Sequence, residues 1–143
     1  MAFSSPELIQ VLNNIKAPYN VSTPTASLAY RALSPAGLAI FKATIATLLA
    51  NRDALATQLV ALPSVLQILG APHANFLLVQ IGTDGRPDNA KAQRVYKKAA
   101  GEEKVVVRFR GNELGCEACL RVTVGTEEEC EAVVRTLAKL LED

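Results

Sequence analysis

Apolar side chains recur along this chain with a helical period in some stretches and in short unbroken runs in others. Between Pro35 and Pro63 they follow the helical period, which predicts one helix of about 25 residues, roughly 38 Å long. Shorter helices are predicted over residues 5–15 and 22–33, each after a serine at the cap position. The length of the long helix is greater than one small core needs. This helix is either a long core helix or a spine that ties this domain to something larger, and the pattern leaves both open.

Short aliphatic and β-branched runs predict a small sheet in the rest of the chain. The four runs are residues 64–69, 75–81, 104–109 and 118–124. Turn residues fill positions 82–87, and Asp88 can cap the helix that follows. Thr126 and Glu129 form a capping box that opens a last amphipathic helix. This order predicts an α+β domain, with a small and mainly antiparallel sheet covered by helices.

The composition fits one compact domain with a core of its own. Half of the 143 residues are hydrophobic, and 15 basic against 14 acidic residues leave a net charge of +1 without any basic run, which excludes nucleic acid as a partner. The start lacks a basic stretch before an apolar core, and no segment reaches the roughly 20 apolar residues of a membrane span. We therefore expect a cytoplasmic protein with no membrane partner. Residues 1–34 are interpreted as a connecting segment and residues 35–143 as the domain.

Two arginines stand among valines in the last two predicted strands. Arg108 and Arg121 are costly there unless each guanidinium meets an anion or opens onto water. A hairpin with its loop centred near Glu113 and Leu114 places Arg108 opposite Cys119. The two arginines are then diagonal neighbours on one face, roughly 7 to 8 Å apart.

The other face of this predicted hairpin is uniformly apolar and belongs to a core. It carries Val105, Val107, Leu120, Val122 and Val124. Two guanidiniums on the opposite face suit a carboxylate or, better, a phosphate. Alternatively, each arginine pairs with a local acid such as Glu113 or Glu117. The spacing alone leaves both interpretations open.

Other candidate chemistry is sparse. Cys116 and Cys119 form a CxxC, but a structural zinc site would also need Cys130 and the single histidine, His73. We predict reduced thiols, with Cys119 and Cys130 as small buried residues, and a loop position for His73. The chain contains no GxGxxG, GxxxxGK[ST], GxSxG or HExxH motif, and no catalytic residue or metal ligand is predicted.

Four segments resemble, in order and spacing, the C-terminal part of histidinol-phosphate aminotransferases. They are Lys-Ala-Pro-Tyr-Asn-Val-Ser at 16–22, Asn-Phe-Leu-Leu at 75–78, Val-Val-Val-Arg at 105–108 and Leu-Arg-Val-Thr-Val-Gly-Thr at 120–126. The resemblance implies the small, substrate-recognising domain of a fold-type I pyridoxal-phosphate enzyme, whose long helix joins the large and small domains. It also implies that Arg108 and Arg121 bind the phosphate of the substrate. In such enzymes an amino group moves between glutamate and imidazole acetol phosphate, a step of histidine biosynthesis.

The same resemblance implies what this chain lacks. The Schiff-base lysine, the aspartate that pairs with the pyridine nitrogen and most residues that hold pyridoxal phosphate lie in the large domain of the family. We therefore expect the cofactor in the full-length family but not on this chain alone, and no transaminase activity from this chain by itself. Its expected partners are a small-molecule phosphate substrate and either a large-domain chain or a second copy in a homodimer. Pro72-His73 stands where relatives tend to have Pro-Ser. The alternative is a non-catalytic binding or interaction module that retained the small-domain fold.

Overall fold

The fold was analysed in a computed structural model that describes residues 3–17, 21–70 and 73–142. The chain divides into two compact units, residues 1–42 and 43–143, and each is considered by itself. The boundary predicted after residue 34 stays a prediction. The Pro-Tyr-Asn part of the first family segment, at 18–20, lies outside the described residues.

The first unit contains two short helices that begin where the sequence predicts. Helix α1 (Pro6–Ile15) follows Ser5, and α2 (Thr23–Ala32) follows Ser22, whose Oγ accepts a hydrogen bond from the Thr25 backbone N–H at 3.3 Å. Neither helix has a buried residue. Their apolar side chains are therefore open to contact from outside the described chain.

Helix α3 (Pro35–Val60) has 26 residues, close to the predicted length. Its C-terminal half packs in the second unit, where Leu55 and Leu59 are buried. Towards its N-terminus, Phe41 is 59% exposed, so the core explains only part of this helix. No single described helix could cross a membrane by length and composition, although α2 and α3, bent by 66° at their junction, pass that test as a pair.

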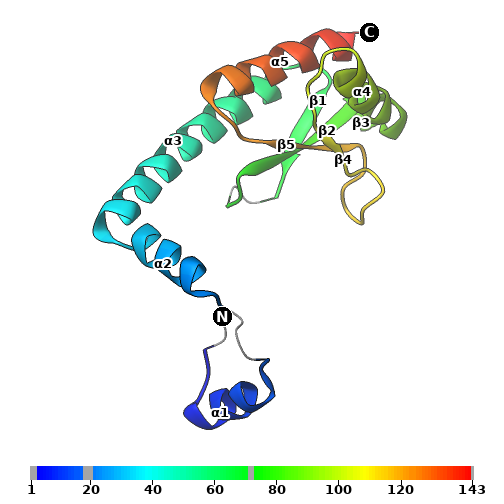
Figure 1. Cartoon of the computed structure of the whole chain (residues 1–143). Coiled ribbons are helices and arrows are strands. Elements are labelled where there is room, and N and C mark those ends of the chain that lie inside the picture. The colour runs from blue at the N-terminus through cyan, green and yellow to red at the C-terminus, as the bar shows by residue number, and fades with distance from the viewer. Residues whose placement is uncertain (1–2, 18–20, 71–72, 143) are drawn as a thin grey trace. The chain divides into compact units, whose positions relative to one another are not determined.

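The second unit is built on an antiparallel sheet, which confirms the predicted α+β class. The strands are β1 (Val65–Leu69), β2 (Phe76–Thr83), β3 (Arg86–Pro87), β4 (Arg108–Phe109) and β5 (Cys119–Thr123). Their order is β1-β2-β5-β4, with β3 paired to the end of β2 (Figure 1). The central strands β2 and β5 pair from Phe76↔Thr123 to Gln80↔Cys119, which fixes the faces of both.

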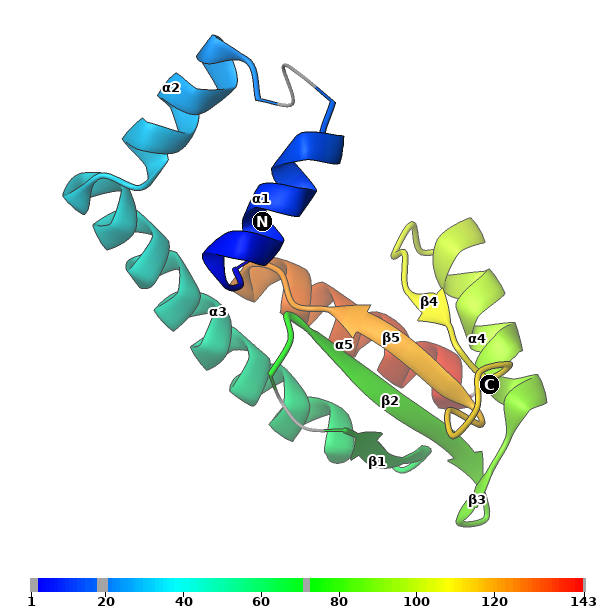
Figure 2. The ribbon, with the colours of Figure 1, turned by 90° about the horizontal axis from the view of Figure 1, so that it is seen from below.

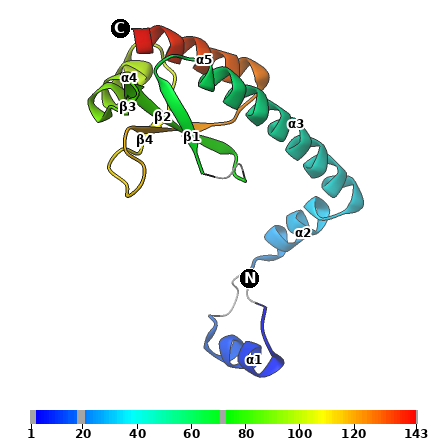
Figure 3. The same cartoon turned by 180° about the vertical axis from the view of Figure 1, so that it is seen from behind.

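The helices of this unit cover one face of the sheet. Figures 1 and 3 show α4 (Asn89–Gly101), α5 (Glu127–Glu142) and the C-terminal part of α3 on the same side of the strands. Alternate sheet residues enter this core and are almost fully buried: Leu77, Val79, Ile81, Leu120 and Val122. The opposite face is turned towards the viewer in Figure 2.

Two predicted segments differ from the structure. The predicted turn at 82–87 is partly sheet, because Asp84 and Gly85 adopt φ values of +52° and +76° and let β2 pair directly with β3. The predicted strand 104–109 is reduced to the two residues of β4. Lys104 has φ +57° and the Val105 N–H donates to the Ala99 carbonyl at 2.9 Å, so the segment before β4 is tied to α4 and not to β5.

The caps predicted for α4 and α5 are formed, as is that of Ser22 at α2, whereas the side chain of Ser5 makes no capping hydrogen bond at α1. Asp88 accepts a hydrogen bond from the Lys91 backbone N–H at 2.9 Å, which, with a second bond from the Thr83 hydroxyl, holds the pKa of the Asp88 carboxyl below its usual value. At α5, the Glu129 N–H donates to Thr126 Oγ1 at 3.3 Å, and the Thr126 N–H donates to the Glu129 carboxylate at 2.8 Å. These caps fix the starts of the two helices that lie against the sheet.

Candidate functional site

Arg108 and Arg121 lie directly opposite each other on β4 and β5. The sequence placed Arg108 opposite Cys119, so the predicted register is wrong by two residues. A shift of two preserves which face each side chain occupies, because strand side chains alternate with a period of two. Both arginines therefore share one face as expected, and they are closer than predicted, since directly opposed residues have Cβ atoms about 4.5 to 5.5 Å apart.

The loop from Arg110 to Ala118 sets the observed register. The Arg110 N–H donates to the Cys119 carbonyl at 2.8 Å, which extends the β4–β5 pairing by one residue. Inside the loop, the Glu113 and Cys116 N–H groups each donate to the carbonyl three residues earlier. Such consecutive turns, which apolar alternation does not reveal, shorten the strands and move the centre of the hairpin.

Helix α4 holds this loop through its first residue, Asn89. The Asn89 side-chain oxygen accepts from the Ala118 N–H at 2.7 Å, and its amide nitrogen lies 3.5 Å from the Gly111 carbonyl. Gly111 fits closely there, because a Cβ atom on it would lie 2.1 Å from Asn89 Oδ1 and 2.4 Å from the Phe109 ring. The loop is thus fixed where it leaves and rejoins the arginine strands.

A cavity of about 540 Å³ opens beside the two arginines. It is lined by Tyr96, Arg108, Phe109, Arg110 and Arg121. The rings of Tyr96 and Phe109 lie 6.5 Å apart and form its apolar part. Three guanidiniums and no carboxylate line this cavity, so its electrostatic character favours an anion.

Arg121 has the more enclosed guanidinium of the opposed pair. Its Cζ lies 5.3 Å from the centre of the Phe76 ring, a cation–π contact across to β2. Its Nε is buried and has no acceptor among the described residues. A buried donor without a partner is destabilising, so this nitrogen calls for an acceptor from outside the described chain.

Local acids do not neutralise the opposed pair in the part of the chain that the structure describes. Glu113 forms its ion pair with Arg110, at 2.5 Å. Glu117 uses its backbone carbonyl to accept from Gln80, and no ion pair joins a described carboxylate to Arg108 or Arg121. The sequence did not identify the Arg110–Glu113 pair, although its i,i+3 spacing in a turn-rich loop was the available signal.

Cys119 and Cys130 occupy the buried positions predicted for them, whereas Cys116 is only half-buried. Cys119 lies opposite Gln80 on the arginine face, and burial, with a smaller contribution from Cys116, raises the pKa of its thiol to about 11. Cys130 is buried against the core, and His73 is exposed in the β1–β2 loop. Within the described residues, no group of three or more His, Cys, Asp or Glu is arranged to hold a metal ion.

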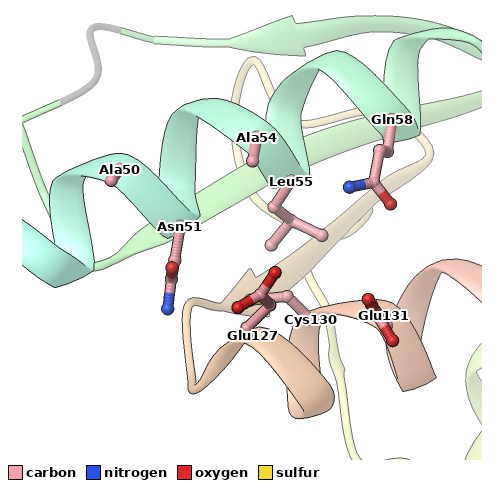
Figure 4. A pocket seen from close by; sticks show the side chains of 8 residues that line it. All are labelled: Ala50, Asn51, Ala54, Leu55, Gln58, Glu127, Cys130 and Glu131. Carbon is pink, nitrogen blue, oxygen red and sulfur yellow. The ribbon is translucent and has the colours of Figure 1, made fainter.

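A second cavity, of about 230 Å³, lies between α3 and α5 (Figure 4). Its lining residues are Ala50, Asn51, Ala54, Leu55, Gln58, Glu127, Cys130 and Glu131. The Asn51 amide donates to the Gly125 carbonyl at 3.0 Å and closes one end of the interface. The interface therefore serves to pack α3 against the start of α5.

The sequence matches a known family over most of its length. Residues 1–137 match the model of aminotransferase class I and II. Histidinol-phosphate aminotransferase of Schizosaccharomyces pombe is 38% identical over 143 residues, which cover 98% of this chain and 37% of that protein. The chain thus spans little more than a third of the length of this relative.

Solved structures share the fold at low sequence identity. A decarboxylase from Sulfurospirillum multivorans matches 94% of this chain with a TM-score of 0.79 and 18% identity, covering 36% of that protein. The histidinol-phosphate aminotransferase from Clostridium acetobutylicum matches 95% with a TM-score of 0.78 and 18% identity, covering 38% of that protein. The predicted small-domain fold is confirmed, and its occurrence in a decarboxylase shows that the fold alone does not define the reaction.

Replacing Gly111 by alanine tests how the loop is held. The added Cβ would collide with Asn89 and Phe109, so we expect Gly111→Ala to lower the free energy of unfolding by about 1 to 3 kcal/mol, measured in urea. Gly101→Ala is the matched control. Its Cβ would have no atom within 4 Å and it lies in a helix, so its stability should be unchanged or slightly higher. Equal stability of the two variants would contradict a tightly fitted Gly111.

Proposed function

Because this chain belongs to the aminotransferase class I and II family, we propose that it supplies substrate-phosphate recognition to a histidinol-phosphate transaminase. It would correspond to the C-terminal part of such an enzyme, with Arg108 and Arg121 as the phosphate-binding residues. The whole enzyme would move an amino group between glutamate and imidazole acetol phosphate. The relative from Schizosaccharomyces pombe supports this substrate class by its sequence similarity.

The observation that carries this proposal is the direct opposition of Arg108 and Arg121. Two guanidiniums on neighbouring strands repel each other, and like charges directly opposite in a sheet are destabilising. An anion between them removes that repulsion. A phosphate also offers enough oxygens to accept from both planar guanidiniums and from the buried Nε of Arg121.

The arginine cavity could accept a phosphate group, but its lining lacks the other residues that would hold pyridoxal phosphate. The family uses this cofactor, which supplies an electron sink for amino transfer when it is bound. The arginine cavity contains neither a lysine amine nor a carboxylate for the pyridine nitrogen. We therefore assign this chain the substrate phosphate and no step of the cofactor chemistry.

A second candidate, an interaction module, is favoured by the exposed apolar side chains of residues 3–17 and 21–42 and of the adjoining part of α3. Large apolar side chains there are well exposed: Leu8, Val11, Leu12, Ile15, Leu28, Leu33, Leu38, Ile40, Phe41, Ile45 and Leu49. Exposed apolar surface on this scale is typical of an interface. The occupant would be a large domain in the first proposal and a second copy or another partner in this one.

Binding of inorganic phosphate should stabilise the 143-residue chain. At ten times its dissociation constant, phosphate should add about 1.4 kcal/mol to the free energy of unfolding and raise Tm by a few degrees. Arg121→Ala should abolish this rise, because it removes the enclosed guanidinium of the pair.

Arg135→Ala is the matched control for charge in that experiment. Arg135 lies on α5 and its side chain is 70% exposed, so its loss should leave the phosphate effect intact. A phosphate effect that survives in Arg121→Ala would show that the ion acts elsewhere.

The purified chain should show no transaminase activity on its own. With pyridoxal phosphate, glutamate and imidazole acetol phosphate added, formation of 2-oxoglutarate should stay at the level of the blank. Addition of a family large domain as a separate chain is the matching positive condition. Turnover by the 143-residue chain alone would contradict the proposed division of roles.

Light scattering tests whether the interaction module binds its own copy. An interaction module that binds its own copy should form dimers or larger species as concentration rises. Phe41→Glu should then restore the monomer, whereas Leu114→Glu, an equally drastic change at a fully exposed leucine of the hairpin loop, should not. A monomer at all concentrations argues against self-association through these apolar side chains.

A further inference from the structure

Arg110 is a third guanidinium at the cavity that contains Arg108 and Arg121. It follows Phe109, whose ring packs towards the core with Tyr96, so alternation places Arg110 on the same side of the strand as Arg108. Its side chain is 31% exposed and is paired with Glu113, whose side chain is 53% exposed. Among the described residues, the Glu113 carboxylate is thus paired with Arg110 and not with Arg108 or Arg121.

The backbone at Arg110 is held in place, whereas its guanidinium can exchange the Glu113 carboxylate for another anion. The Arg110 N–H is bonded to the Cys119 carbonyl, and the next residue, Gly111, fits against Asn89 and Phe109. An exposed ion pair such as Arg110–Glu113 contributes little to stability, so exchanging the Glu113 carboxylate for another anion costs little. A long arginine side chain can make that exchange by rotation alone.

The charges around the cavity define which anion makes the exchange favourable. Once Glu113 is displaced, the three guanidiniums carry three positive charges. A phosphate dianion neutralises two of them, whereas a carboxylate neutralises one. A monoanion is also a poor replacement for Glu113, because it brings the same charge without the advantage of being attached to the loop.

We propose that Arg110 is a specificity-determining residue that Glu113 holds until a phosphate dianion displaces the carboxylate. This inference rests on the proposed function, since it assumes that Arg108 and Arg121 bind the phosphate. It assigns to Arg110 the discrimination between phosphate and carboxylate ligands, and to Glu113 the occupation of the third guanidinium in the free protein.

A double-mutant cycle on the 143-residue chain tests the inference, with inorganic phosphate and acetate as probes at pH 8 and constant ionic strength. Arg110→Ala should weaken phosphate binding about fivefold to tenfold and change acetate binding less than twofold. Glu113→Gln should tighten phosphate binding about threefold. In the Arg110→Ala background, Glu113→Gln should have no effect, because the guanidinium that it releases is gone.

Glu117→Gln is the matched control for charge, since it removes a carboxylate from the same loop that has no ion pair among the described residues. If it tightens phosphate binding as much as Glu113→Gln, or if Glu113→Gln acts equally with and without Arg110, the inference is wrong. Circular dichroism checks that each variant is folded.

The Arg121→Ala variant shows whether a negative result refutes only the role of Arg110 or also the proposed function. If the parent chain binds phosphate, Arg121→Ala loses it and changes at Arg110 and Glu113 have no effect, only the role of Arg110 is refuted. If the parent chain and Arg121→Ala bind phosphate equally weakly, both the proposed function and the inference fail.

Discussion

Burial of one face of β2 and β5 is the constraint on which the rest of this domain depends. Val79, Leu120 and Val122 must lie against the helices, because leaving such side chains in water costs about 1.5 to 3 kcal/mol each. Once they are buried, the period of two along a strand puts Arg121 on the opposite face. The short β4 follows the same rule, so the arginine pair results from the core and needs no separate positioning device.

This dependence explains how much of the fold and of the site could be predicted from the sequence. The helices, the α+β class and the shared face of Arg108 and Arg121 follow from apolar periodicity, which survives a register error of two residues. The length of β4 could not be predicted from this periodicity, because it depends on the positive φ of Lys104 and on a hydrogen bond to α4. The pairing of Glu113 with Arg110 is likewise set by a turn inside the loop, in which the Glu113 N–H donates to the Arg110 carbonyl.

The site gains its specificity from elements that are far apart in the sequence. Asn89 at the start of α4 fixes the loop, Phe76 on β2 covers Arg121, and the loop brings a third arginine to the cavity. None of these contacts supplies a group for bond making or breaking. The chain itself spans little more than a third of the length of the relatives it matches.

The shortness of β4 has a consequence for how this protein meets other chains. An edge strand normally exposes a row of free N–H and C=O groups that can recruit a strand from another molecule. Here the edge has only two residues, an arginine comes just before and just after Phe109, and the preceding segment is tied to α4. The border of the sheet that presents the cationic site is therefore accessible to a small anion but a poor template for β-sheet growth, so ligand access is combined with resistance to aggregation.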